Sequence, residues 1–237
     1  SLPGILPVPD PSDKDTDLMS YVTTYLEEEI RAEAVVRKIG DFARFLELAA
    51  AESGRIVNLL KLSQEIGVSH TTIGAYYQIL EDCLIADRIE PLTQSRTRKK
   101  LTKSAKYLFF DLGVRRIAAR EGSRLSRETL GSIFEQFVGL ELLRGCRSKM
   151  KGAKLLFWRD PDGPEVDWVI DDEGRYTPVE VKWTDRPTSS DIRHLEVFLS
   201  EYPSAQKACL VCQVPRKVKL GDNVFALPWQ DVHGLIA

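Results

Sequence analysis

The sequence predicts a mixed α/β fold, with a helical N-terminal part followed by a mixed sheet flanked by helices. Three short apolar runs, 155–158, 165–170 and 178–183, are separated by Asp-Pro-Asp-Gly and Asp-Asp-Glu-Gly. These separators favour tight turns between antiparallel strands. Apolar residues at helical spacing precede and follow the three runs. From residue 123 onward we therefore expect a helix, three strands, a helix and two further strands.

The bulk properties indicate a globular chain with room for more than one domain. It has 237 residues, of which 43% are hydrophobic and 29% charged. The net charge of −2 gives no global attraction to nucleic acid, so such binding would need a local patch. No apolar run approaches the roughly 18 residues of a membrane-spanning helix, and no signal peptide opens the chain. We therefore predict a cytoplasmic protein with no membrane partner.

The four cysteines also fit a reducing compartment. Cys209 and Cys212 have the spacing of a metal-binding or redox pair, but they lie in an apolar run that is typical of a buried strand. Positions three apart on a strand face opposite sides, so both sulfurs cannot bind one ion. We predict buried thiols.

The N-terminal part is predicted to be scaffold. Residues 1–17 carry four prolines and read as an irregular lead-in, and helical periodicity begins near Asp17 and recurs from Asp41 to Ala51. We assign 1–54 to this helical lead-in, 55–120 to a second domain and 121–237 to an α/β domain.

The second domain has the spacing of a helix-turn-helix. A short apolar stripe from Leu59 to Ile66 ends at Gly67-Val-Ser, and a Ser-capped helix follows with Ile73, Tyr77 and Leu80. Two predicted strands, 84–90 and 107–110, then enclose a basic loop, so the domain is winged-helix-like. Its candidate nucleic-acid contacts are His70, Thr71 and Thr72 on the second helix and Arg96, Arg98, Lys99, Lys100 and Lys103 in the loop.

That second helix offers no Arg or Lys to DNA. Two interpretations therefore stay open: a DNA-binding module, and a module that packs against or binds protein. Binding through the loop would weaken steeply with salt, because the contacts would be to phosphates.

The chemistry of the α/β domain is concentrated on two neighbouring strands. Residues two apart on a strand share a face, so Asp167 projects from one strand while Glu180 and Lys182 project together from the next. If these faces coincide, two carboxylates and a lysine converge on one spot. Such a group suits a hard divalent cation beside a cationic side chain.

This order of elements and these residues resemble the PD-(D/E)XK nuclease-like superfamily. The matching positions are Glu135 on the preceding helix, Asp167 on the second strand and Glu180-Val-Lys182 on the third. The resemblance implies that Asp167, Glu180 and Glu135 hold one or two Mg²⁺ ions (or Mn²⁺) and that Lys182 assists phosphodiester hydrolysis.

Most of the chain also resembles the C-terminal portion of a prokaryotic AAA+ ATPase family, a portion of unknown function. The resemblance rests on Tyr25-Leu-Glu-Glu-Glu-Ile, Gly67-Val-Ser, Tyr107-Leu-Phe-Phe-Asp-Leu-Gly, Gly131-Ser-Ile-Phe-Glu-Gln-Phe-Val, Phe157-Trp-Arg-Asp, Glu165-Val-Asp-Trp-Val and Val179-Glu-Val-Lys. The resemblance implies an ATP-binding module upstream. The chain itself has no Gly-x-x-x-x-Gly-Lys-Ser/Thr loop and hence no ATP site of that kind.

Three functions follow as hypotheses. The first is a metal-dependent nuclease attached to an ATPase, with DNA as the partner. The second is a catalytically silent nucleic-acid-binding module. The third is a protein-interaction or regulatory domain of the ATPase. The sequence leaves the oligomeric state open.

Overall fold

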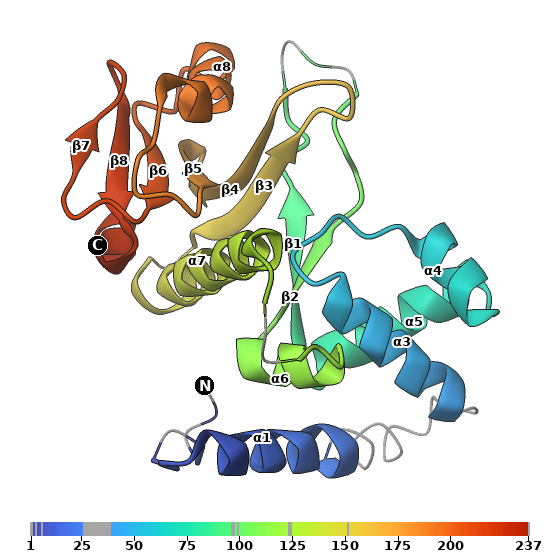
Figure 1. The fold of residues 1–237 in the computed structure, drawn as a ribbon. Helices are drawn as coiled ribbons and strands as arrows, with labels where there is room; N and C mark the ends of the chain where they lie inside the picture. The colour runs from blue at the N-terminus through green and yellow to red at the C-terminus, as the bar shows by residue number, and fades with distance from the viewer. Residues whose placement is uncertain are drawn as a thin grey trace. The chain divides into compact units, whose positions relative to one another are not determined.

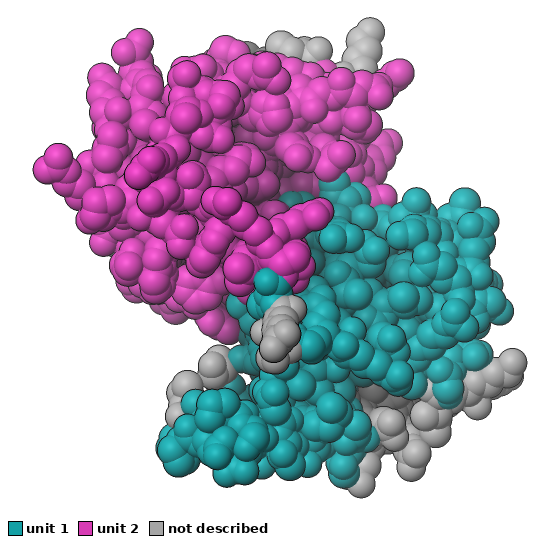
Figure 2. All heavy atoms as spheres, in the orientation of Figure 1, with its two compact units in different colours: residues 1–88, 106–125 teal, residues 89–105, 126–237 magenta. Residues whose placement is uncertain are grey.

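A computed structural model describes residues 2, 4–5, 7–25, 39–95, 98, 100–122, 125–150 and 152–236. The chain divides into two compact units (Figure 2). Unit 1 comprises residues 1–88 and 106–125, and unit 2 comprises residues 89–105 and 126–237. The segment 89–105, which the sequence analysis places in the middle domain, is therefore part of the same compact unit as the C-terminal region.

Unit 1 is mainly helical (Figure 1). Its elements are α1 (Pro11–Ser20), a π-helical turn η1 (Tyr21–Tyr25), α3 (Ile39–Ala51), α4 (Leu59–Ile66), α5 (His70–Asp82), β2 (Lys106–Phe109) and α6 (Leu112–Ala118). The expected irregular lead-in is wrong from residue 11 onward. Asp10 accepts a hydrogen bond from the Ser12 amide, and Pro11 suits the first helical turn, so the helix starts earlier than its apolar pattern suggests.

Two capped helices, α4 and α5, lie where the helix-turn-helix was predicted. The Asn58 side chain accepts from the Lys61 amide before α4, Gly67 adopts a φ of 83° after it, and Ser69 accepts from the Thr72 amide before α5. The buried face of α5 packs on aromatic rings of unit 1. Tyr77 lies 4.9 Å from Phe45 and stacks at 4.1 Å on Tyr107 of β2 (distances between ring centroids). The helix α6 was not predicted.

Unit 2 is a twisted sheet between helices (Figure 1). Its elements are the end of β1 (Ala86–Pro91), α7 (Arg127–Lys149), β3 (Lys154–Arg159), β4 (Glu165–Asp172), β5 (Arg175–Val181), the 3-10 turn η2 (Ser189–Ile192), α8 (Arg193–Glu201), β6 (Ala208–Cys212), β7 (Val218–Lys219), β8 (Val224–Pro228) and the 3-10 turn η3 (Trp229–Leu235). Among the strands of unit 2 the order is β1-β3-β4-β5-β6-β8-β7. The mixed α/β class is confirmed.

The three central strands form the antiparallel meander that their turns predicted. Glu90 and Pro91 at the end of β1 pair in parallel with β3, and β5, β6 and β8 are mutually parallel. The short edge strand β7, which pairs antiparallel with β8, was not predicted. Because β5, β6 and β8 run the same way, their carboxyl ends, Val181, Cys212 and Pro228, lie along one edge of the sheet.

A bulge in β4 sets the orientation of the central side chains. Leu156 pairs with Val169 but Trp158 pairs with Val166, so β4 has one extra residue at this point. Val166 and Val169 consequently share the core under α8. Trp168 faces the opposite helix α7, where its ring approaches the backbone of Gly139. Asp167 lies within the bulge.

Among the described residues, no helix is long and apolar enough to cross a membrane.

Candidate functional site

The structure brings Asp167, Glu180 and Lys182 together on adjacent strands of unit 2. Trp168 pairs with Val179, and one further step of this antiparallel register places Asp167 opposite Glu180. The Asp167 carboxylate accepts a hydrogen bond of 2.8 Å from the Val181 amide. The Lys182 Nζ atom lies 2.9 Å from Glu180 Oε1. The predicted convergence is therefore present in the fold.

Glu180 is a buried acid, and one of its two carboxylate oxygens has no hydrogen-bond partner among the described residues. The residue is 4% exposed. Its Oε2 atom has no hydrogen-bond partner within the part of the chain that the structure describes. Burial raises the pKa of Glu180, and the nearby positive charges of Lys182 and His194 offset only part of this rise. A buried acceptor without a partner is costly, so this oxygen is suited to an added cation or donor.

Lys182 connects the buried acid to the surface. Its side chain is 43% exposed. Burial acts to lower the pKa of Lys182, but the carboxylates of Glu180 and Asp167 outweigh that effect, and the pKa is raised. The lysine therefore stays charged beside Glu180.

Glu135 approaches from a different side of the sheet. It lies on α7, and the Trp168 indole donates to its backbone carbonyl at 3.2 Å. Trp168 and Val179 face α7, whereas Glu180 alternates with Val179 and faces the α8 side. Within the described residues no three or more His, Cys, Asp or Glu side chains are grouped so that they could hold a metal ion. The structure thus joins Asp167 and Glu180 without Glu135 as a third ligand.

His194 is a neighbour of the site that sequence reasoning missed. It lies in the first turn of α8, beside the fully buried Leu195, and its charge acts on Glu180. No motif contains it. The only signal in the sequence is its position on the amphipathic helix, next to a residue that faces the sheet.

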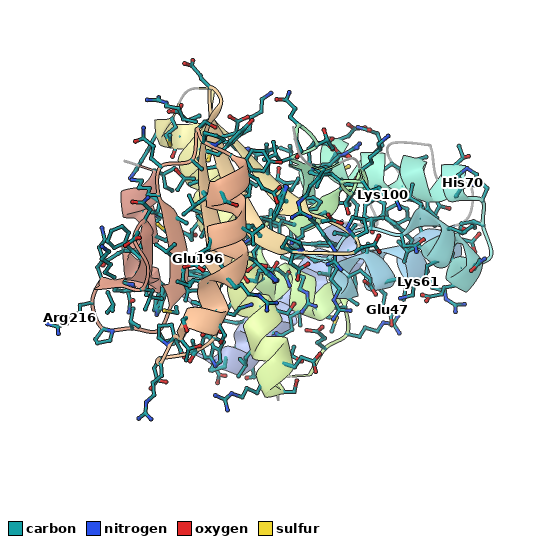
Figure 3. The ribbon with its side chains drawn as sticks, turned by 90° about the horizontal axis from the view of Figure 1, so that it is seen from above. Glu47, Lys61, His70, Lys100, Glu196 and Arg216 are labelled. Atoms are coloured by element: carbon teal, nitrogen blue, oxygen red, sulfur yellow. The ribbon has the colours of Figure 1, made fainter. Side chains whose placement is uncertain are left out.

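The candidate nucleic-acid residues of unit 1 are accessible but few. His70 and Thr71 are exposed in the first turn of α5, as Figure 3 shows for His70. The Thr72 hydroxyl is hydrogen-bonded to Ser69 Oγ at 2.8 Å and takes part in the helix cap.

The candidate basic loop belongs to unit 2, and among its described cations Arg98 is paired with carboxylates. Lys100 and Lys103 are exposed, whereas Arg96 and Lys99 lie outside the described residues. Arg98 is engaged. It forms an ion pair with Asp160, donates from Nε to Glu201 Oε2 at 2.9 Å, and lies 5.2 Å from the centroid of the Trp158 ring. Arg98 thus anchors the loop to the sheet and α8.

The buried cysteines agree with their prediction. Cys209 and Cys212 are buried, and neither is in a disulfide. Burial raises the pKa of the Cys209 thiol to about 11, so it stays protonated at neutral pH.

The fold and this site define a two-unit α/β protein with an acidic pair and a lysine at a sheet edge. The chain belongs to the family described as Domain of unknown function (DUF8612), whose model matches residues 2–125. A second family model, Domain of unknown function (DUF4143), matches residues 130–232.

Two curated relatives are uncharacterized proteins of Mycobacterium tuberculosis and Mycobacterium bovis. Each is 26% identical over 211 residues, which is 88% of this chain and 46% of the relative. The chain therefore spans less than half the length of these relatives.

Two solved structures are distantly similar. A McrB AAA+ assembly with bound McrC from Thermococcus gammatolerans has 14% identity and a TM-score of 0.34, over 78% of this chain and 45% of that one. A Vibrio cholerae protein has 12% identity and a TM-score of 0.30, over 94% and 54%.

Proposed function

We propose that unit 2 is a nuclease-like domain that hydrolyses phosphodiester bonds with the help of a divalent metal ion. The observation that carries this proposal is the buried Glu180 carboxylate, whose Oε2 atom has no partner among the described residues, in register with Asp167. A buried carboxylate oxygen without a hydrogen-bond partner lowers the stability of the fold, and function is a common reason for such a cost.

The residues fit one Mg²⁺ or Mn²⁺ ion better than two. Mg²⁺ is usually held by one or two carboxylates and keeps several of its waters. Asp167 and Glu180 supply two carboxylates, whereas Glu135 lies on α7, on the other side of the sheet. When bound, the ion would supply Lewis-acid polarisation of a phosphoryl oxygen and a water of lowered pKa.

The chain's own residues would orient the reaction. The Val181 amide holds the Asp167 carboxylate in place. Lys182 would stabilise negative charge on the phosphoryl group from the exposed side of the site, and its raised pKa keeps it protonated for that purpose.

We propose further that this domain is the C-terminal region of a larger AAA+-type ATPase that works on DNA. The support is the sequence resemblance together with the relatives, which extend well beyond the matched part. In unit 1 the order α3, α4, α5, β1, β2 supports a winged-helix module. The loop between β1 and β2 belongs to unit 2. We therefore propose packing or partner binding as a role for this module on an equal footing with DNA binding.

A second candidate is a silent version of the same site, in a DNA-binding or regulatory domain. It is favoured by the 2.9 Å contact in which Lys182 Nζ already neutralises Glu180 Oε1. In that case the cluster is an internal ion pair and the domain acts by binding alone.

A cleavage assay separates the two candidates. Single-stranded and duplex DNA are incubated with Mg²⁺, Mn²⁺ or a chelator and with the wild type, Glu180→Gln or the control Glu196→Gln. Glu196 is exposed on α8 (Figure 3), so its substitution should leave activity unchanged. We expect metal-dependent cleavage that falls at least about 100-fold in Glu180→Gln. Wild-type protein without metal-dependent cleavage would establish the silent candidate.

A further inference from the structure

Three arginines of unit 2 lie at the carboxyl edge of the parallel strands. Arg186 follows β5, Arg193 opens α8, and Arg216 follows β6. The loop after β5 and the loop after β6 are joined, because the Gln213 amide donates to the Thr184 carbonyl at 2.8 Å. Lys182 emerges at the same edge. In open α/β sheets, ligands bind beyond the carboxyl ends of parallel strands.

These three arginines differ from four others in unit 2. Arg98, Arg144, Arg159 and Arg175 each form an ion pair with a carboxylate. Arg186, Arg193 and Arg216 are exposed, and none forms an ion pair with a described residue. Figure 3 shows the Arg216 side chain extending away from the sheet. Three guanidinium groups without carboxylate partners on one edge are suited to external anions.

Three carboxylates also lie at this edge, namely Asp185, Asp191 and Asp231. Asp191 accepts from the Thr188 amide at 2.7 Å and from the Thr188 hydroxyl at 2.9 Å, so it is used in capping η2. Asp185 is exposed and is the immediate neighbour of Arg186. The three arginines and Lys182 outnumber these three carboxylates by one, so anion binding would depend on guanidinium groups that lack an ion-pair partner among the described residues and not on the net charge of the edge.

An exposed aromatic ring lies on the same edge. Trp229 follows the carboxyl end of β8, is 37% exposed, and is supported by an edge contact of 5.6 Å between its ring centroid and that of Phe137. The β7–β8 register, in which Val218 pairs with Ala226, places Arg216 beside Pro228, next to this tryptophan. Cations that follow a backbone, together with a ring on which a base can stack, are typical of single-stranded nucleic-acid binding.

We propose that this arginine edge (Arg186, Arg193, Arg216) binds the phosphate backbone of single-stranded nucleic acid and that Trp229 stacks on a base. The inference deepens the proposed function, on which it rests, by assigning the path of the substrate toward Lys182 and Glu180. It also moves the expected phosphate contacts from Arg98, which is paired with Asp160 and Glu201, to arginines that form no ion pair with a described residue.

The test is a binding titration in chelator, where no cleavage occurs. A fluorescein-labelled oligodeoxythymidine of about 20 nucleotides, long enough for one site, is titrated by anisotropy between about 50 and 200 mM salt. The test variant carries Arg186→Ala, Arg193→Ala and Arg216→Ala. The control variant loses the same charge at the amino edge of the sheet, through Lys149→Ala, Lys154→Ala and Lys207→Ala.

We expect the arginine variant to bind at least tenfold more weakly at the lower salt concentration. The slope of log K against log salt should become shallower by about 2, since each single-strand phosphate contact contributes about 0.7. The control variant should change both quantities much less. Single substitutions should each lower the slope by about 0.7, so the test remains decisive if the triple variant fails to fold.

Trp229→Ala should weaken binding while leaving the salt slope unchanged, because stacking releases no counterions. Equal losses in the arginine and control variants would overturn the proposal. Equal competition by a polyglutamate peptide would also overturn it, in favour of an acidic protein partner. Binding by the wild type without cleavage would reject the nuclease while this edge stands, and cleavage that survives loss of the arginines would reject the edge alone.

Discussion

Glu180 holds a buried carboxylate on β5, and Lys182 contacts only one of its two oxygens. Its neighbours on β5 and β6, Val179 and Leu210, are fully buried. The charge state of this one residue therefore couples the stability of unit 2 to pH.

The first prediction concerns Glu180→Gln. Because burial raises the pKa of Glu180 above its ordinary value of 4.5, the folded protein binds the proton more tightly than the unfolded chain. This residue's contribution to stability is then greatest at low pH and is lost as pH rises from about 4.5 through the folded pKa. Glutamine removes this dependence. The free energy of unfolding of the variant, minus that of the wild type, should increase between pH 4 and pH 7 in urea titrations.

A constant difference across that range would contradict the raised pKa. The control is Glu196→Gln, an exposed acid on α8, for which we expect no such trend.

The second prediction concerns Arg98. Its guanidinium contacts two carboxylates and the Trp158 ring, and only 21% of its side chain is exposed. Arg98→Ala removes the ion pairs with Asp160 and Glu201, so we expect a loss of about 1–3 kcal/mol in the free energy of unfolding. Lys100→Ala, two residues away and exposed, should change it by less than about 0.5 kcal/mol. Chemical denaturation followed by tryptophan fluorescence measures both.

If Arg98 instead acts as a phosphate contact, its removal will leave stability unchanged and weaken DNA binding. That outcome would restore the original interpretation of the loop.

At the scale of elements, α7 shows how helix propensity and packing compete. Two of its glycines differ in surroundings. A Cβ atom at Gly131 would meet nothing within 4 Å, whereas a Cβ atom at Gly139 would lie 2.6 Å from the Trp168 ring. The ring is fully buried and its indole donates to the Glu135 carbonyl. The close approach of α7 to β4 therefore depends on Gly139.

The third prediction follows from that contrast. Gly131→Ala should raise the free energy of unfolding by about 0.5–1 kcal/mol, the usual gain from alanine in a helix. Gly139→Ala should lower it by about 1–3 kcal/mol, because the buried ring must shift. Thermal unfolding monitored by circular dichroism compares the two. Stabilisation by both substitutions would show that α7 and Trp168 can separate at little cost.

Local patterns predicted most of the elements. The meander follows from turn residues between apolar runs, and α4 and α5 follow from Asn58, Gly67 and Ser69, which act within four residues of the groups they cap. The acidic pair and Lys182 follow from strand alternation. Elements with weak local signals were missed, namely the start of α1, α6 and the two-residue strand β7.

At the scale of the whole molecule, the information that was missing is long-range. Arg98 and Glu201 are 103 residues apart in sequence, and no periodicity connects a basic loop to the end of α8. The same limit applies to His194 beside Glu180 and to the three arginines of the carboxyl edge. Their roles depend on the order of the strands within the sheet. Hence the residues of the candidate site were predictable, but their surroundings were not.

The division of the chain into units leads to the last prediction. Segment 89–105 contributes Leu92 to the buried core under α8, pairs with β3 through Glu90 and Pro91, and places Arg98 over Trp158. A fragment of residues 126–237 loses all three interactions, whereas a fragment of residues 89–237 keeps them. We expect the shorter fragment to unfold at a lower urea concentration and with a smaller m-value, because less surface is buried in its folded state. Tryptophan fluorescence, to which Trp158 contributes together with Trp168, Trp183 and Trp229, should be shifted to longer wavelength in the short fragment before urea is added. Equal midpoints and equal spectra would mean that residues 126–237 form a complete unit and that the loop only rests on it.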